Sequence, residues 1–89
     1  MNPAEKIPPE FAKFVRGQLA SVADKLFLSW DTPDVYAFVR EVTPDLSSIV
    51  NRVEEAVAER FGAPAFTVHL VAHQGRPTPE DYYGCVRLK

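Results

Sequence analysis

The stretch "WDTPDVYAF", residues 30–38, decides the fold of this chain. Its Thr-Pro-Asp core returns at residues 43–45, and it nearly returns at residues 78–80, where Glu replaces Asp. This triplet is typical of a helix start, because Thr caps free N–H groups, Pro suits the first helical position and an acid is favoured near the positive end of the helix dipole. Three helix starts predict a helical protein, whereas a single one leaves room for a sheet.

Residues 43–45 are the copy that a long helical pattern follows. Apolar residues then recur at spacings of three and four, which places them on one helical face. Gly62 supplies a C-terminal stop, with Pro64 just beyond it. We therefore expect a helix from residue 44 to about residue 61. The apolar stripe comprises Leu46, Ile49, Val50, Val53, Val57 and Phe61.

A first helix is expected after Pro8-Pro9, where Pro9 suits the first helical turn. Gly17 lies inside this pattern, at a cost of about 1 kcal/mol relative to Ala, and we expect the helix to tolerate it. We expect residues 1–7 to form a flexible N-terminal lead-in and residues 8–89 to form a single domain. The apolar face comprises Phe11, Phe14, Val15, Leu19, Val22 and Leu26.

The C-terminal third of the chain reads as strands. Apolar side chains recur at every second position of residues 66–73, and the segment contains β-branched residues. This pattern predicts a strand. The segment "QGRPTPED", residues 74–81, interrupts regular structure, and residues 82–89 favour β-structure again. We expect a hairpin with a long loop, in which residues 78–80 form a turn at most.

Residues 33–42 fit both a helix and a strand. Their apolar residues have helical spacing, but "VYAFV" is rich in β-branched and aromatic residues, which favour strands. We favour a strand that forms a hairpin with "KLFLSW", residues 25–30, around the polar loop 31–34. The predicted fold is an α+β two-layer sandwich of order αββαββ, with two helices on one face of a mostly antiparallel four-stranded sheet. The alternative is three helices plus a C-terminal β-hairpin.

Composition excludes several classes of protein. The apolar fraction of 46% and the charged fraction of 25% are those of a globular domain, and no apolar run reaches the roughly 18 residues of a membrane helix. We expect a cytoplasmic protein without a secretory signal, although a processed chain could have lost one. The single cysteine fits a reducing compartment, and the sequence carries no cofactor motif. A net charge of −2 makes nucleic acid an unlikely partner.

The alternation of the predicted strands leaves one sheet face open. If Tyr82, Val86 and Leu88 join the core, then Tyr83, Cys85, Arg87, His69 and His73 share the open face. The first hairpin adds either Tyr36, Phe38 and Arg40 or Val35, Ala37 and Val39 to it. An apolar face of this kind needs a cover. A second copy of the chain, making a homodimer, is the favoured cover, and the N-terminal segment or the long loop is the alternative.

Two residue pairs on this face invite a chemical interpretation. His69 and His73 are about 13 Å apart on a strand, which is too far for them to share a metal, and we predict no metal site. In an antiparallel hairpin His69 would lie opposite Cys85, as a base beside a nucleophile, with Asp31, Asp34 or Asp81 to orient the histidine. No motif surrounds the pair, so these two are weak catalytic candidates.

The favoured function is a small non-enzymatic protein-interaction or regulatory module. It would act through the open sheet face and the 73–81 loop, with Tyr83, His69, His73, Gln74 and Arg76 as binding residues. The alternative is a small enzyme or ligand-binding domain that uses His69, Cys85 and Arg76. A third possibility is single-stranded nucleic-acid binding through sheet-face aromatics such as Tyr36, Phe38 and Tyr83.

Overall fold

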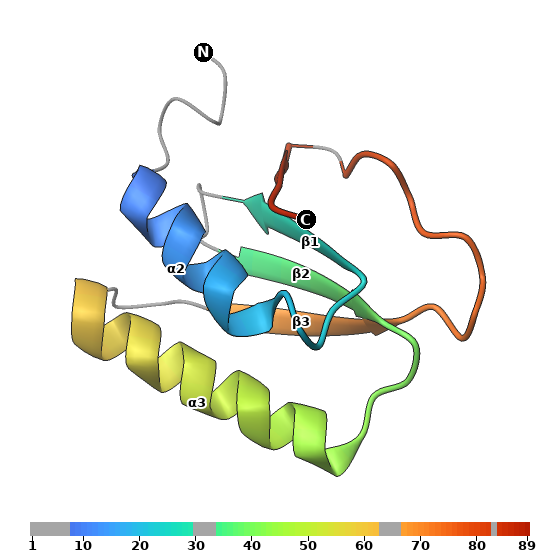
Figure 1. The fold of residues 1–89 in the computed structure, drawn as a ribbon, viewed down its shortest axis with the longest axis horizontal. Coiled ribbons are helices and arrows are strands. Elements are labelled where there is room, and N and C mark those ends of the chain that lie inside the picture. Colours follow the sequence, from blue (N-terminus) through green and yellow to red (C-terminus); the bar gives the residue numbers. More distant parts are fainter. Residues whose placement is uncertain (1–7, 30–33, 63–66, 83) are drawn as a thin grey trace.

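A computed structural model describes residues 8–29, 34–62, 67–82 and 84–89. Along the chain the elements are α2 (Pro9–Leu19), β1 (Lys25–Ser29), β2 (Asp34–Val39), α3 (Pro44–Phe61), β3 (Thr67–Ala72) and β4 (Val86–Arg87). Figure 1 shows them as one compact α+β unit. The predicted lead-in at residues 1–7 and most of the loop 31–34 lie outside the described residues.

The sheet is mixed, so the expectation of a mostly antiparallel sheet is wrong. Its strand order is β3-β2-β1-β4. Strand β1 pairs antiparallel with both β2 and β4, whereas β2 and β3 are parallel. The predicted C-terminal hairpin is also wrong, because β3 and β4 lie at opposite edges of the sheet. A parallel pair needs a crossover connection, and α3 provides it between β2 and β3.

The ambiguous segment is a strand, and the three-helix alternative is wrong. Strand β2 pairs with β1 over five residue pairs and with β3 over six. Val35 and Ala37 are fully buried in it. The β-branched and aromatic side chains suit a central strand, and two hydrogen-bonded ladders outweigh the helical spacing of the same residues.

Helix α3 has the ends that the sequence predicts. The Thr43 hydroxyl accepts a hydrogen bond from the Leu46 N–H at 3.2 Å, and Pro44 is the first helical residue. Gly62 adopts a left-handed φ of 65°, and its N–H donates to the Ala58 carbonyl at 2.8 Å. These local signals need no tertiary contact, which is why the sequence alone locates this helix.

Both helices contribute to the main core, which they share with inward-facing residues of the sheet. Phe61 at the end of α3 contacts two rings of α2, with ring centroids 5.2 Å from Phe11 and 5.7 Å from Phe14. Near the other end of α2 the Lys89 ammonium donates to the carbonyls of Ala20 and Ala23 at 2.6 and 2.7 Å. The buried core residues are Phe11, Val15, Leu19, Ala23, Leu26, Leu28, Val35, Ala37, Val39, Val50, Val53, Val57 and Val68.

Strand β3 forms one edge of the sheet. The His73 N–H donates to Val39 of β2 at 2.9 Å, so by alternation the backbone groups of Val68, Leu70 and Ala72 point outward. The Val68 N–H is bound there by the Glu54 carboxylate of α3 at 3.0 Å. Glu54 therefore satisfies one of the outward backbone donors of this edge.

None of the described helices is long and apolar enough to cross a membrane.

Replacing Gly17 with Ala is expected to stabilise the protein. A Cβ at this exposed site on α2 meets no atom within 4 Å, and Ala has a helix propensity about 1 kcal/mol better than that of Gly. We expect urea denaturation to show a free energy of unfolding that is higher by roughly 0.5–1 kcal/mol. The control, Gly62→Ala, should lower it, because φ is positive at Gly62. Equal effects of the two substitutions would contradict this account.

Candidate functional site

The outer face of the sheet, which is turned away from the helices, is crossed by residues 73–82, which we call the strap. Strand β3 lies at one edge of the sheet and β4 at the other, so the connection must run from one edge to the other. In Figure 1 this segment leaves the end of β3, loops away from both helices and returns to β4 beside β1. The aromatic contacts of Tyr82 locate its last part on the outer face.

Tyr82 covers the apolar centre of this face. Its ring centroid lies 5.6 Å from that of Phe27 and 5.9 Å from that of Phe38. These two phenylalanines, on β1 and β2, are only 1% and 6% exposed. The expectation that Tyr82 joins the main core is wrong. Tyr82 lies on the outer face of the sheet, opposite the main core, and is 36% exposed. Within one chain, the end of the strap thus provides a cover for this face.

The exposed end of the same face is a stack of three rings. Tyr36 is the middle ring. Its centroid lies 4.8 Å from that of Tyr82 and 5.0 Å from that of His69, and the Tyr36 and His69 rings have an interplanar angle of 17°. Beside the stack, a carboxylate oxygen of Asp34 lies 2.9 Å from Nε2 of His69. Asp34 was one of three acids expected to orient this histidine, and the structure confirms that contact. We call Asp34, Tyr36, His69 and Tyr82 the stacked site.

Charge and burial change the chemistry of the stacked site. Partial burial raises the pKa of the Tyr36 phenol, and the negative charge of Asp34 beside it raises the pKa further. The hydroxyl therefore stays protonated at neutral pH and can donate a hydrogen bond. His69 is exposed and Tyr36 half-buried, so a partner molecule has access to both rings.

His73 fastens the beginning of the strap. Its Nε2 lies 2.5 Å from a carboxylate oxygen of Asp24, and its Nδ1 accepts a hydrogen bond from the Gly75 N–H at 3.0 Å. Because Nδ1 accepts, the ring proton of the neutral histidine is on Nε2 and points to Asp24. His73, expected as a binding residue, is half-buried and holds the strap to the segment before β1.

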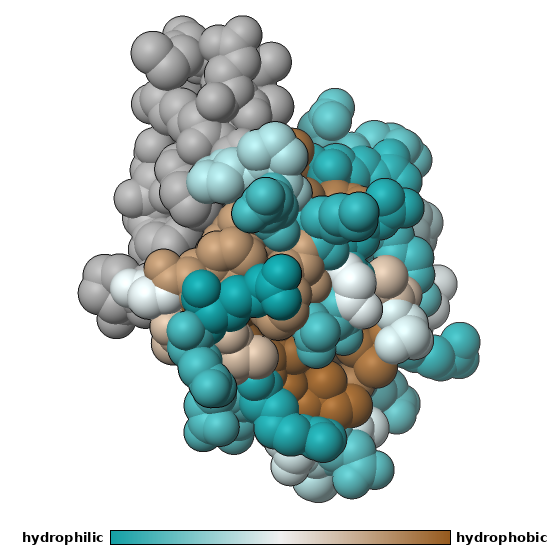
Figure 2. Space-filling view, turned by 60° about the vertical axis from the view of Figure 1, so that its left-hand side comes forward, coloured by the Kyte–Doolittle hydropathy of each residue, from teal (hydrophilic) through white to brown (hydrophobic). Residues whose placement is uncertain are grey.

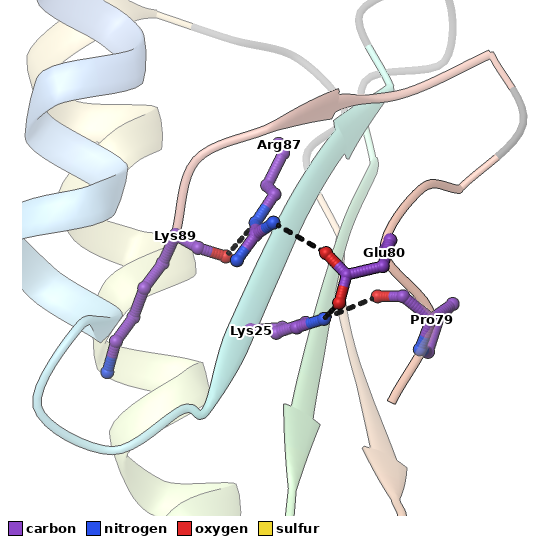
Figure 3. A network of polar contacts seen from close by, with 5 residues as sticks. All are labelled: Lys25, Pro79, Glu80, Arg87 and Lys89. Carbon is purple, nitrogen blue, oxygen red and sulfur yellow. Dashed lines mark hydrogen bonds and ion pairs between the residues drawn. The ribbon is translucent and has the colours of Figure 1, made fainter. Parts of the chain in front are cut away.

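The middle of the strap is tied to both β1 and β4, as Figure 3 shows. The Lys25 ammonium donates to the Pro79 carbonyl at 2.8 Å and lies 3.5 Å from the Glu80 carboxylate. The Arg87 guanidinium reaches the other oxygen of Glu80 at 3.3 Å. Its Nε also donates to the Lys89 carbonyl at 3.0 Å. Glu80 is 83% exposed, so these ion pairs position the strap more than they stabilise it.

The expected pairing of His69 with Cys85 is wrong. His69 pairs with Tyr36 across the β2–β3 ladder, whereas Cys85 precedes β4, which pairs with β1. Partial burial raises the pKa of the Cys85 thiol, and the Asp34 carboxylate raises it further. A raised pKa keeps the sulfur in its weakly nucleophilic thiol form at neutral pH. The environment of Cys85 is thus the reverse of one that activates a catalytic cysteine.

The other expected site residues lie on the strap. Gln74 is exposed and has a left-handed φ of 54°, and Arg76 is exposed beside it. The Arg76 N–H donates to the His73 carbonyl at 2.9 Å, which closes the turn. Tyr83 lies outside the described residues. Within the part of the chain that the structure describes, no three His, Cys, Asp or Glu residues could together hold a metal ion.

Sequence reasoning missed Phe27 and Asp24. A signal for Phe27 was present, because "LFL" at residues 26–28 is a continuous apolar run of the kind found in strands that are buried on both faces. Such a run predicts that the outer face is covered. No sequence signal marks Asp24, because its contact with His73 joins residues 49 positions apart.

Comparison with protein-family models, curated proteins and solved structures finds no significant match to this chain.

Replacing Tyr82 with Ala should uncover the outer face. The substitution removes the ring that lies over Phe27 and Phe38, and we expect a loss of roughly 1–3 kcal/mol in the free energy of unfolding, given its partial exposure. The folded variant should also enhance the fluorescence of an apolar dye more than the wild type does. Unchanged dye binding together with unchanged stability would contradict the covering role. Glu55→Ala, on the outer face of α3, is the control.

Cys85 should react slowly with iodoacetamide at neutral pH. Its raised pKa leaves less thiolate in the folded protein than in the unfolded chain. The alkylation rate, followed by mass spectrometry, should be lower in buffer than in urea. The alkylation rate of the folded protein should climb only when the pH rises above the ordinary pKa of a cysteine thiol, because the Cys85 thiol ionises only there. A folded-state rate above that of the unfolded chain would contradict this and would revive the catalytic interpretation.

Proposed function

We propose that this protein is a non-enzymatic interaction module that binds a partner protein through the stacked site and the adjoining strap. The observation that carries the proposal is the ring stack of His69, Tyr36 and Tyr82 at the surface. Stacked aromatic side chains lose little conformational entropy on binding, and Tyr is enriched among the residues that dominate binding energy at protein interfaces. The stack thus provides a rigid anchor for a partner.

The surroundings of the stack support an interface more than a reaction centre. The Asp34 carboxylate, the His69 imidazole and the Tyr36 hydroxyl supply polar groups beside exposed ring surface, a mixture typical of protein interfaces. Arg76 on the strap adds an exposed cation of a type that interfaces favour. The protonated state of Cys85 at neutral pH argues against the enzyme alternative.

A second copy of the chain is the simplest partner, and a homodimer remains part of the proposal. The strap reduces the need for it, since Phe27 and Phe38 are already buried within one chain. A dimer would have to use the stacked site itself. Light scattering over a concentration series tests this form, because a dimer has twice the 10.0 kDa chain mass.

The decisive experiment compares binding by variants of the proposed surface and by a control. We expect His69→Ala and Arg76→Glu to lose a partner that the wild type and Glu55→Ala both capture from cell extract. The captured protein is then purified and titrated by calorimetry, and its affinity for each site variant should fall by about tenfold or more. Circular dichroism verifies that all variants are folded.

Two outcomes would overturn the proposal. One is a purified partner that binds the site variants as tightly as it binds the wild type. The other is the absence of any partner, including a second copy, whose binding depends on His69 or Arg76.

A further inference from the structure

We propose a second binding surface, on the opposite side of the sheet, which takes an extended acidic peptide segment of a partner protein. It is built by the solvent face of α2 together with its two neighbours, β4 on one side and the end of α3 on the other. Two adjoining hollows of about 370 and 420 Å³ flank α2 there, and Lys13 lines both of them. We call these two hollows the α2 groove.

The α2 groove is positively charged although the whole chain is not. Lys13 and Arg16 lie on the rim of the hollow beside β4, and Lys13 and Arg60 line the hollow beside α3. Glu10 is the one carboxylate among the lining residues. With Arg87, the lining carries four of the ten Lys and Arg residues and one of the twelve acids, so acids outnumber cations in the rest of the chain. Such a local field favours a negatively charged partner.

These cations keep their N–H donors available for a ligand. No ion pair or hydrogen bond occupies the side chains of Lys13, Arg16 or Arg60 within the described part of the chain. The Arg60 guanidinium lies over the rings of Phe14 and Phe61 at 5.0 and 5.8 Å, which holds it in place with its N–H donors available. Lys13 and Arg16 are three residues apart on one helix, a spacing at which like charges repel.

Part of the lining of the groove is apolar, which argues for a peptide and against a bare anion. Beside β4 it is made by Pro9, Ala12 and Leu88, and beside α3 by Phe14. Figure 2 shows the side of the molecule where the left-hand ends of both helices in Figure 1 come forward, and apolar surface lies there between hydrophilic side chains. A segment that carries both acidic and apolar side chains matches this combination.

The edge of β4 offers backbone groups to the same segment. The Leu88 N–H donates to Leu26 of β1 at 2.8 Å, so by alternation the backbone N–H and C=O of Arg87 point to the free edge. Neither group has a partner among the described residues. Arg87 and Leu88 line the groove. An extended peptide can therefore add to this edge while its carboxylates reach Lys13 and Arg16.

A selection from a display library of random peptides tests the proposal on the full chain. We expect the enriched peptides to carry net negative charge together with apolar residues. Synthetic copies, measured by fluorescence anisotropy, should bind Lys13→Glu/Arg16→Glu at least about tenfold more weakly than the wild type. The charge-preserving variant Lys13→Arg/Arg16→Lys should keep the affinity to within about threefold, and the matched control Arg40→Glu/Arg52→Glu should behave likewise.

Amide shifts in NMR spectra locate the bound peptide on the folded protein. On peptide addition the largest changes are expected at residues 12–16 and 87–88. His69→Ala should leave peptide binding unchanged, so failure here and failure of the stacked site are distinguishable.

Three results would overturn the proposal. The first is a selection without acidic enrichment, and the second is equal binding to Lys13→Glu/Arg16→Glu. The third is displacement of the peptide by inorganic phosphate or a poly(dT) oligonucleotide at concentrations comparable with that of the peptide, which would assign the groove to a phosphate ligand.

Discussion

The parallel pairing of β2 with β3 is the constraint on which the rest of this structure depends. It occupies one side of β2 while β1 occupies the other, so β4 can extend the sheet only beyond β1 or beyond β3. The chain takes the place beyond β1, and it must therefore carry its last strand from one edge of the sheet to the opposite edge. The strap is the physical result, and the burial of Phe27 and Phe38 on a face that would otherwise be bare follows from it.

The difference between local signals and long-range pairing explains what could be predicted from the sequence. Helix α3 depends on Thr43, Pro44 and Gly62, which act within a few residues of the helix ends, so its bounds were predictable. Residues 33–42 matched both the helix and the strand pattern, with the strand favoured, and the pairing of β2 on both sides explains why the strand forms. Strand order could not be predicted, because periodicity reports which face of a strand is buried and carries no information about which neighbour it pairs with.

The candidate site shows the same division. Alternation correctly placed His69 on the outer face, and Asp34 was among the acids expected beside it. The cross-strand neighbour of His69 was wrongly expected to be Cys85 and is Tyr36, because the hairpin assumed for the last two strands does not form. Tyr82 was assigned to the wrong side for the same reason: alternation was extended backwards from β4 into a segment that is not a strand.

The bond between Glu54 and the Val68 N–H bears on how this protein behaves in concentrated solution. An uncovered strand edge is a template on which another chain can add, and fibrous aggregates grow by that route. The carboxylate occupies one outward donor of β3 and places a negative charge there, so an incoming strand meets both a missing hydrogen bond and an unfavourable charge. Resistance to aggregation thus depends in part on a helix side chain that belongs to neither the main core nor the stacked site.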